Sequence, residues 1–118
     1  MFIGEDHLPK QVYLTVCEPG MVKGPHLHKT RWGAFTCVRG NLRLIARVGS
    51  EYEEYFSGED YAYATIEVPP GIPAALQSIG AVPAYILNMP SPAWRPEDRD
   101  EHEVVFPEEI LQWPRRAK

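Results

Sequence analysis

The stretch KGPHLHKTRWGAF, residues 23–35, decides how the fold of this 118-residue chain is interpreted. It contains two histidines, His26 and His28, one residue apart after a Gly-Pro step. Side chains two residues apart on a β-strand point to the same face of the sheet. We therefore expect both imidazoles on one side of a strand. That arrangement is typical of half a metal site, or of a catalytic histidine with a neighbour.

Proline and glycine interrupt the chain at short intervals on both sides of this stretch. The sequence contains 12 prolines and 9 glycines, and short β-rich runs lie between them. This pattern is typical of many short strands joined by tight turns, as in a sandwich or a barrel. We predict strands in residues 10–18, 33–40, 41–50, 51–58, 61–71, 74–80 and 83–90, and a connection in residues 18–26.

Residues 41–50 show the alternation of a half-buried strand most clearly. Leu42, Leu44 and Ala46 alternate there with Arg43, Ile45 and Arg47. The alternation predicts a strand with two different faces, because successive side chains on a strand point to opposite sides of the sheet. We also expect this strand to form a hairpin with the preceding one through an Arg-Gly turn.

Composition and charge limit the classes of function. Apolar residues make up 44% of the chain and charged residues 24%, a soluble globular balance. The net charge is −4 with no basic stripe, so we expect no nucleic-acid partner. The sequence has no membrane-length apolar run and its N-terminal residues lack a secretory pattern, so we expect no membrane partner and a cytoplasmic location. Cys17 and Cys37 are interpreted as small buried core residues.

The segment after Pro90 is polar, acidic and broken by proline. We interpret it as a loop, with a possible last strand in residues 103–106. Residues 107–113 are predicted to form a short helix, because Pro107 stands near its first position and two acidic residues follow. The whole chain, 1–118, is expected to be one domain, with a barrel at about 12–90 and a polar C-terminal extension at 91–118.

The arrangement of strands and motifs resembles the cupins, whose fold is an all-β double-stranded β-helix, or jelly roll. Metal cupins have a first motif G-x5-H-x-H-x3,4-E-x6-G and a second motif G-x5-P-x-G-x2-H-x3-N. The first motif is matched by Gly20, His26, His28 and Gly40, whereas its glutamate position falls on Gly33, or on Trp32 with the shorter spacing. The second is matched by Pro69 and Gly71, but Tyr63, Ala74 and Ser78 stand at its leading glycine, histidine and asparagine positions.

This resemblance argues against a tight metal site. A catalytic metal site needs about three protein ligands with open positions, and His26 and His28 supply two. Neither Gly33 nor Ala74 has a side chain that can bind a metal. We therefore predict no metal and no cofactor. A metal-dependent cupin with an unusual ligand set, completed by His7 or His102, is the alternative.

The sequence is also similar to two sugar-modifying cupin families. KGPHLH resembles the R-G-L-H-F-Q stretch of dTDP-4-dehydrorhamnose 3,5-epimerase, which implies that His26 is the catalytic base, and Trp94 stands where that family has its catalytic tyrosine. Lys23 and His28 replace that family's arginine and glutamine. The order of GPHLHKTRWGAF, SGED, VPPGIPAALQSIG and WRPEDRDEH is similar to the C-terminal cupin domain of capsular-polysaccharide reductases.

His26 is accordingly predicted to be a general base that removes a proton next to a keto group. The developing enolate oxygen also needs stabilisation, for which an inward-facing Lys29, Arg31, Arg43 or Arg47 could serve. Alternatively, His26 is a barrel histidine hydrogen-bonded to the backbone. The residues predicted to bind substrate are His28, Lys23, Lys29, Arg43 and Trp94.

Two of these binding residues have alternative interpretations. Trp94 could stack on a ring or cap the barrel as a hydrophobic plug. Arg43 could bind a diphosphate if its strand face points inward, or be a solvated charge if the face points outward. A tyrosine-rich cluster in residues 52–63 is expected at an edge or a dimer interface.

The prediction is a nucleotide-sugar-modifying cupin of the epimerase or isomerase type, acting on a 4-keto-deoxy sugar in deoxysugar or polysaccharide biosynthesis. We expect it to be a homodimer with a small sugar-type ligand. The alternative is a non-catalytic cupin that binds a sugar or another small ligand and has a degenerate metal site.

Overall fold

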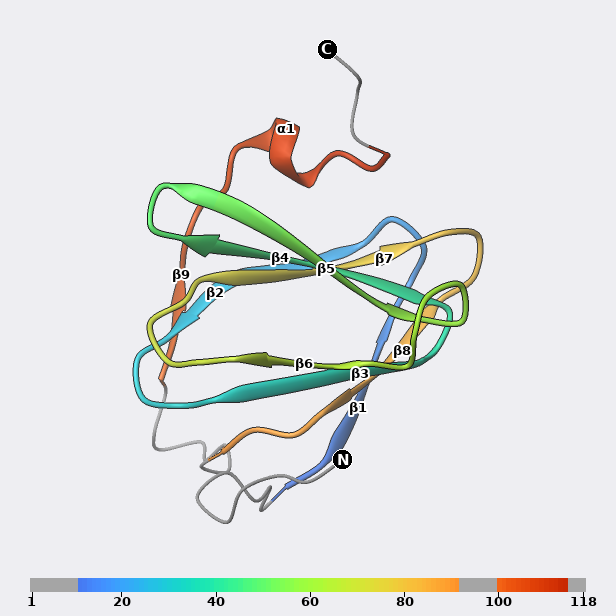
Figure 1. Ribbon diagram of the computed structural model, residues 1–118, viewed down its shortest axis with the longest axis horizontal. Helices are drawn as coiled ribbons and strands as arrows, with labels where there is room; N and C mark the ends of the chain where they lie inside the picture. The colour runs from blue at the N-terminus through green and yellow to red at the C-terminus, as the bar shows by residue number, and fades with distance from the viewer. Residues whose placement is uncertain (1–10, 92–99, 115–118) are drawn as a thin grey trace.

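The computed structural model describes residues 11–91 and 100–114. Within these residues the chain forms nine strands and one short helix (Figure 1). The strands are β1 (Tyr13–Cys17), β2 (Val22–His28), β3 (Gly33–Arg39), β4 (Asn41–Val48), β5 (Glu51–Gly58), β6 (Thr65–Val68), β7 (Ala74–Ile79), β8 (Ala84–Asn88) and β9 (Glu101–Glu103), and the helix is α1 (Glu108–Leu111).

The strands form two antiparallel sheets that face each other (Figure 1). One sheet has the order β1-β8-β3-β6 and the other β5-β4-β7-β2-β9, so most neighbours in a sheet are distant in sequence. This is the jelly-roll arrangement, in which the chain crosses repeatedly between the two layers. The prediction of an all-β double-stranded β-helix with a short C-terminal helix is confirmed.

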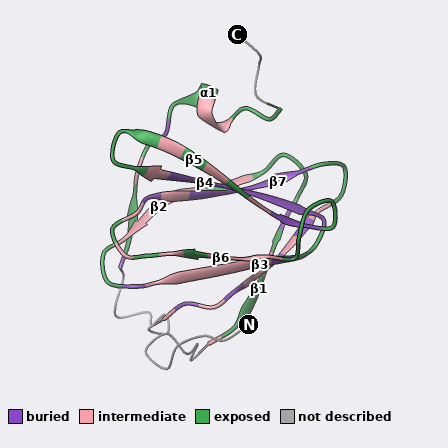
Figure 2. Cartoon of the chain, viewed as in Figure 1, coloured by how far each residue is buried: buried purple, intermediate pink, exposed green. Residues whose placement is uncertain are grey.

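The core lies between the sheets and is densest under β4 and β7 (Figure 2). The strand predicted at residues 41–50 is present as β4, and its Leu42, Leu44 and Ala46 belong to this core. Both cysteines are also buried in it, as expected. The buried members of this cluster are Cys17, Cys37, Leu42, Leu44, Ala46, Leu76, Ala84 and Ile86.

The expected hairpin between residues 33–40 and 41–50 is wrong. Strand β3 pairs with β6 and β8 in one sheet, whereas β4 pairs with β5 and β7 in the other. Gly40 makes the transition with a φ of 72°, and a side chain there would collide with the carbonyl oxygen of Pro83. Only glycine adopts this left-handed conformation freely with the backbone so close. The turn therefore carries the chain from one layer to the other.

The C-terminal segment covers the outer face of the five-stranded sheet (Figure 1). Phe106 is buried there against Ile45 and Ala75, and α1 adds Ile110 and Leu111 to the same cluster. This second core is the reason that β4 is buried on both of its faces. The helix is shorter than predicted and comprises four residues after Pro107.

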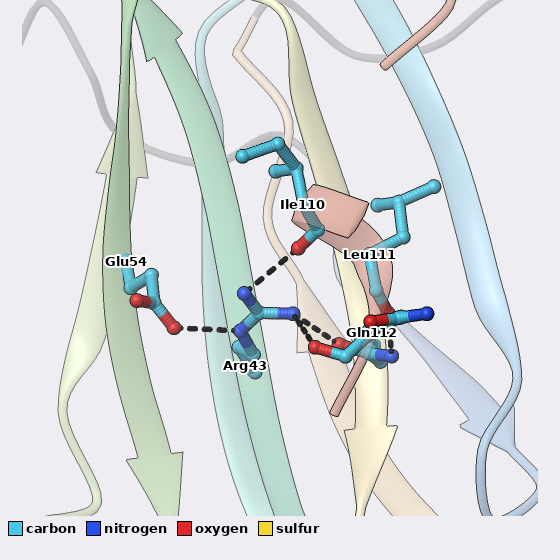
Figure 3. A network of polar contacts seen from close by, with 6 residues as sticks. Arg43, Glu54, Ile110, Leu111 and Gln112 are labelled. Atoms are coloured by element: carbon cyan, nitrogen blue, oxygen red, sulfur yellow. Dashed lines mark hydrogen bonds and ion pairs between the residues drawn. The ribbon is translucent and has the colours of Figure 1, made fainter. Parts of the chain in front are cut away.

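Arg43, on the outer face of β4, holds this segment through hydrogen bonds to its carbonyl oxygens (Figure 3). Its Nη2 donates to the Ile110 carbonyl oxygen at 2.9 Å and its Nη1 to the Gln77 side chain at 2.7 Å. Nε forms a 2.7 Å ion pair with Glu54, and the Gln77 amide donates in turn to the Leu111 carbonyl oxygen at 2.7 Å. The guanidinium also lies over the Trp113 ring, 5.3 Å from its centroid.

Two further boundaries differ from the prediction. The segment 18–26, expected to be a connection, contributes most of β2, which begins at Val22. The last strand lies at Glu101–Glu103 rather than 103–106, and it pairs with the edge of β2. All three of its side chains are exposed, so no apolar alternation marks it in the sequence. The part of the chain that the structure describes has no helix long and apolar enough to cross a membrane.

Candidate functional site

A cavity of about 450 Å³ lies at one end of the barrel. Strand β2 contributes more polar residues to its wall than any other strand, β1, β8 and β9 contribute one each, and the others lie before β1 and in the turn after β2. Its polar lining consists of Gln11, Tyr13, Lys23, His26, His28, Arg31, Asn88 and Glu101. Its apolar lining includes Phe35, Val68, Ile72, Leu76 and Met89. A mostly apolar cavity of this size with a few converging polar groups is typical of a small-molecule site.

His26 and Glu101 form an ion pair in this cavity, with Nδ1 and Oε1 2.7 Å apart. The register of β2 and β9 creates the pair: His28 lies opposite Glu101 and His26 opposite Glu103, so His26 and Glu101 are diagonal neighbours on one face. Because Nδ1–H donates to the carboxylate, the other ring nitrogen, Nε2, is left to accept a proton.

His28 lies on the same face of β2, as the i, i+2 spacing predicts. Its Nδ1 is buried and has no hydrogen-bond partner among the described residues. Burial lowers the pKa of His28, and the positive charge of Arg31 lowers it further, whereas Glu101 and Asp100 act in the opposite direction. His28 is therefore neutral at pH 7, with a ring nitrogen to which no group of residues 11–91 and 100–114 hydrogen-bonds.

Arg31 and Tyr13 complete the polar wall. Arg31 is 4% exposed, so its charge belongs to the cavity wall rather than to the outer surface. Burial raises the pKa of Tyr13, and the negative charge of Glu101 raises it further, while Arg31 lowers it. The phenol consequently keeps its proton at neutral pH and can donate it.

The structure brings together three of the residues predicted from the sequence, Lys23, His26 and His28. It does not bring Lys29 or Arg43 to the cavity. Lys29 is exposed in the turn after β2. Arg43 points to the outer face of the five-stranded sheet, where it binds the C-terminal segment, so its predicted role in substrate binding is wrong. Trp94 lies outside the described residues.

The third and fourth ligand positions of the metal-cupin motifs line the cavity but carry no side chain that can bind a metal. Gly33 and Ala74 both line it, and Ala74 lies opposite His26 in the β2–β7 pairing. A side chain on Gly33 would meet the Phe35 ring, whose nearest atom lies 2.8 Å from the Cβ position. The residues at these positions therefore do not fit the metal of that family. Among residues 11–91 and 100–114, no group of three or more His, Cys, Asp or Glu side chains is arranged to hold a metal ion.

Sequence reasoning missed Glu101, Tyr13 and Asn88. Glu101 was hidden in an acidic segment interpreted as a loop. Tyr13 was missed because Val12, Leu14 and Val16 are the apolar set of the alternation and would be expected inside, whereas the structure leaves those three exposed and puts Tyr13 in the cavity lining. Asn88 is buried at the end of β8 and pairs with Tyr13 in register, a contact between distant segments that no local pattern shows.

A jelly-roll barrel with a histidine-lined cavity between its sheets defines the class of the cupins. The family model described as "FdtA: WxcM-like, C-terminal" matches residues 6–106, and the chain belongs to this family. No curated protein sequence matches the chain.

Several solved structures share the fold. The capsular polysaccharide assembling protein CapF from Staphylococcus aureus matches with a TM-score of 0.76 and 22% identity, over 89% of this chain and 31% of CapF. The 3'-monoepimerase ChmJ from Streptomyces bikiniensis, in complex with dTDP-quinovose, matches with a TM-score of 0.74 and 22% identity, over 95% of this chain and 61% of ChmJ. NovW, a 4-keto-6-deoxy sugar epimerase from Streptomyces spheroides, matches with a TM-score of 0.72 and 25% identity, over 92% of this chain and 58% of NovW. The chain thus spans about a third of CapF.

Proposed function

We propose that this protein is a nucleotide-sugar-modifying cupin of the epimerase or isomerase type, acting on a 4-keto-deoxy sugar in deoxysugar or polysaccharide biosynthesis. The observation that carries the proposal is the His26–Glu101 pair, 2.7 Å between Nδ1 and Oε1, in the wall of the cavity. The family and the folds of ChmJ and NovW support it, because both of these proteins are described as sugar epimerases.

His26 has the arrangement of a general base. With Nδ1–H donated to Glu101, Nε2 takes a proton from the carbon next to the ketone, and the carboxylate stabilises the imidazolium that forms. The electron pair of the broken C–H bond moves onto the ketone oxygen, which becomes an enolate. Lys23 and Arg31 both line the cavity and are the cations that would stabilise this oxygen.

Epimerisation or isomerisation also requires the proton to return to carbon from a suitable group. His28 and Tyr13 lie in the same cavity as His26. Tyr13 keeps its proton because its pKa is raised, so it is a possible donor, whereas His28 is neutral and could relay one. A second proton-transfer group beside the first supports an enzyme over the alternative of a non-catalytic sugar-binding cupin.

The test is deuterium exchange from solvent into a dTDP-linked 4-keto-6-deoxy sugar in D₂O, followed by NMR at the carbons next to the ketone. We expect exchange that falls about 10²- to 10⁴-fold in His26→Ala, the usual range for a lost general base. His102→Ala is the matched control, because His102 lies on the same strand as Glu101 but is exposed and outside the cavity. If the wild-type protein exchanges no faster than His26→Ala, the proposed enzymatic activity is contradicted. Retained sugar binding would then favour the non-catalytic alternative.

We also propose that the protein is a homodimer and resides in the cytoplasm. Strand β1 supports the dimer, because it is the edge of its sheet among the described strands and Val12, Leu14 and Val16 form an exposed apolar stripe along it. Light scattering of the purified protein should give twice the chain mass. A monomer mass at micromolar concentration would contradict the dimer.

A further inference from the structure

The Asp100 carboxylate binds the turn between β2 and β3. Its Oδ2 accepts hydrogen bonds from the backbone amides of Thr30 and Arg31, both at 2.9 Å, and its Oδ1 accepts one from Lys29 at 3.0 Å. Asp100 is 7% exposed. One side chain thus joins two segments about seventy residues apart in sequence.

The two segments that Asp100 joins each deliver a charged group to the cavity. The backbone amide of Arg31 donates a hydrogen bond to Asp100, and the buried side chain of Arg31 lines the cavity. Glu101 is the next residue along the chain and pairs with His26. The Asp100 carboxylate therefore holds the backbone of Arg31 directly, and Glu101 follows Asp100 in the sequence.

Within the described residues, the beginning of strand β9 has few contacts besides Asp100. The strand has three residues, all exposed, and β2 is its one neighbour among the described strands, with Glu101 opposite His28. Beyond its other end, the Val104 amide donates to the Pro25 carbonyl oxygen at 3.3 Å and Phe106 is buried in the outer core. The end that carries Glu101 adjoins Asp100.

We propose that Asp100 is a positioning residue of the site, which sets the His26–Glu101 pair and the cavity-facing Arg31 at the same time. Its catalytic consequence rests on the proposed function; its structural consequence does not. An ionised carboxylate is suited to this role, because it only accepts hydrogen bonds and here faces three donors. Although burial raises the pKa of Asp100, the amides of Thr30, Arg31 and Lys29 outweigh that effect and lower it to about 2.

The decisive variant is Asp100→Asn, which turns an NH₂ group toward backbone amides that are donors themselves. The matched control is Asp60→Asn, since Asp60 also accepts a hydrogen bond, from Asn41 Nδ2 at 3.0 Å, but lies outside the cavity lining. The first readout is the tautomer of His26, taken from the ¹⁵N shifts of its ring. The second is amide hydrogen exchange of Lys29, Thr30 and Arg31. The third is kcat and KM in the deuterium assay.

In Asp100→Asn we expect His26 to lose the Nδ1–H tautomer, to the extent seen in Glu101→Ala, which removes the acceptor, and the three amides to exchange at least about tenfold faster. The kcat should fall more than KM rises, and Asp60→Asn should change none of the three readouts. A wild-type tautomer and unchanged amide exchange in Asp100→Asn would overturn the proposal. If that variant fails to fold, Asp100→Glu, which keeps a carboxylate but displaces it, is held to the same outcomes.

The proposed function and this inference fail in different ways. An inactive wild-type protein would remove the epimerase or isomerase, while the tautomer and exchange readouts would still decide the role of Asp100. Conversely, if the wild-type protein is active but the His26 tautomer is unchanged in Asp100→Asn, the proposed function stands and the positioning role of Asp100 is contradicted.

Discussion

The two faces of the five-stranded sheet each carry a polar cluster, and the clusters differ in how completely they are satisfied. On the outer face, Arg43 has 0% exposure and hydrogen-bonds to Glu54, Gln77 and the carbonyl oxygens of the C-terminal segment (Figure 3). On the inner face, His28 has a buried Nδ1 with no partner among the residues the structure describes.

The difference separates stability from function. Buried polar groups in proteins are almost always hydrogen-bonded, because an unpaired one loses its hydration without compensation. A satisfied cluster such as that of Arg43 holds segments together and has little left to offer a ligand. An unsatisfied one in a cavity wall is a place where a ligand can supply the missing partner.

The largest effect that we predict is on the Arg43 side. Arg43→Ala should lower the free energy of unfolding by about 3–5 kcal/mol, the usual cost of removing one partner of a buried ion pair. It leaves the Gln77 side-chain oxygen and the carbonyl oxygens of Ile110 and Gln112 without their donor. Urea denaturation followed by tryptophan fluorescence measures this loss.

Arg47→Ala is the control for that prediction. Arg47 lies on the same strand face, partly exposed, 6.0 Å from the Phe106 ring centroid. Its removal should cost about 1 kcal/mol or less, as expected for a partly solvated cation–π contact. If both variants lose the same free energy of unfolding, the Arg43 network contributes no more than an ordinary surface charge. The contrast between the satisfied outer cluster and the unsatisfied inner one would then not hold.

An intermediate effect on stability is expected at Asp100, whose carboxylate next to the cavity residues has its hydrogen bonds formed. Its pKa is lowered from 3.8 to about 2 in the folded protein, so the unfolded chain takes up the proton first as the pH falls. Its contribution to stability is present above about pH 4 and is lost as the pH falls toward 2. Asp100→Asn should cost about 2 kcal/mol at neutral pH, in the range for hydrogen bonds to a charged group, and less in acid. Urea titrations across this range check the slope, and parallel wild-type and variant curves would contradict it.

The sequence predicted the elements that carry a strong local pattern. The alternation of Leu42 and Leu44 with Arg43 correctly predicts the strand β4, and the i, i+2 spacing of His26 and His28 correctly predicts that both lie on one face of β2, where both line the cavity. Each of these inferences depends only on the period of a strand. That is why they needed no knowledge of the rest of the fold.

What depends on distant partners was not predictable in this way. Arg43 was expected either to be solvated or to bind substrate, and neither is true, because a segment almost seventy residues away covers it. Glu101 was missed because an exposed three-residue edge strand has no alternation, and backbone pairing with β2 alone defines it. In both cases the missing information was a tertiary contact made by the C-terminal segment.

A smaller effect is expected at His28 and would sharpen the comparison. His28→Phe keeps a ring of similar shape and removes the unpaired nitrogen, so the free energy of unfolding at neutral pH should stay unchanged or rise by about 1 kcal/mol. Sugar-nucleotide binding, measured by calorimetry, should weaken at the same time, because function is often maintained at the expense of stability. A destabilised variant with unchanged binding would show that His28 is a packing residue.

The smallest effect is the pH dependence that His28 gives to folding. Its pKa is lowered from 6.5 by burial and then by Arg31 and His26, against the opposing charges of Glu101 and Asp100. Below about pH 6.5 the unfolded chain therefore binds a proton at this site that the folded protein resists, and stability falls. Between about pH 7 and about pH 5, wild-type protein should therefore lose more stability than His28→Phe does. His102→Phe, altered at an exposed histidine, should follow the wild type. If His28→Phe loses as much stability as the wild type over this pH range, the site is hydrated enough for His28 to accept the proton. His28 would then not be an unsatisfied group, and the contrast with Arg43 would be contradicted.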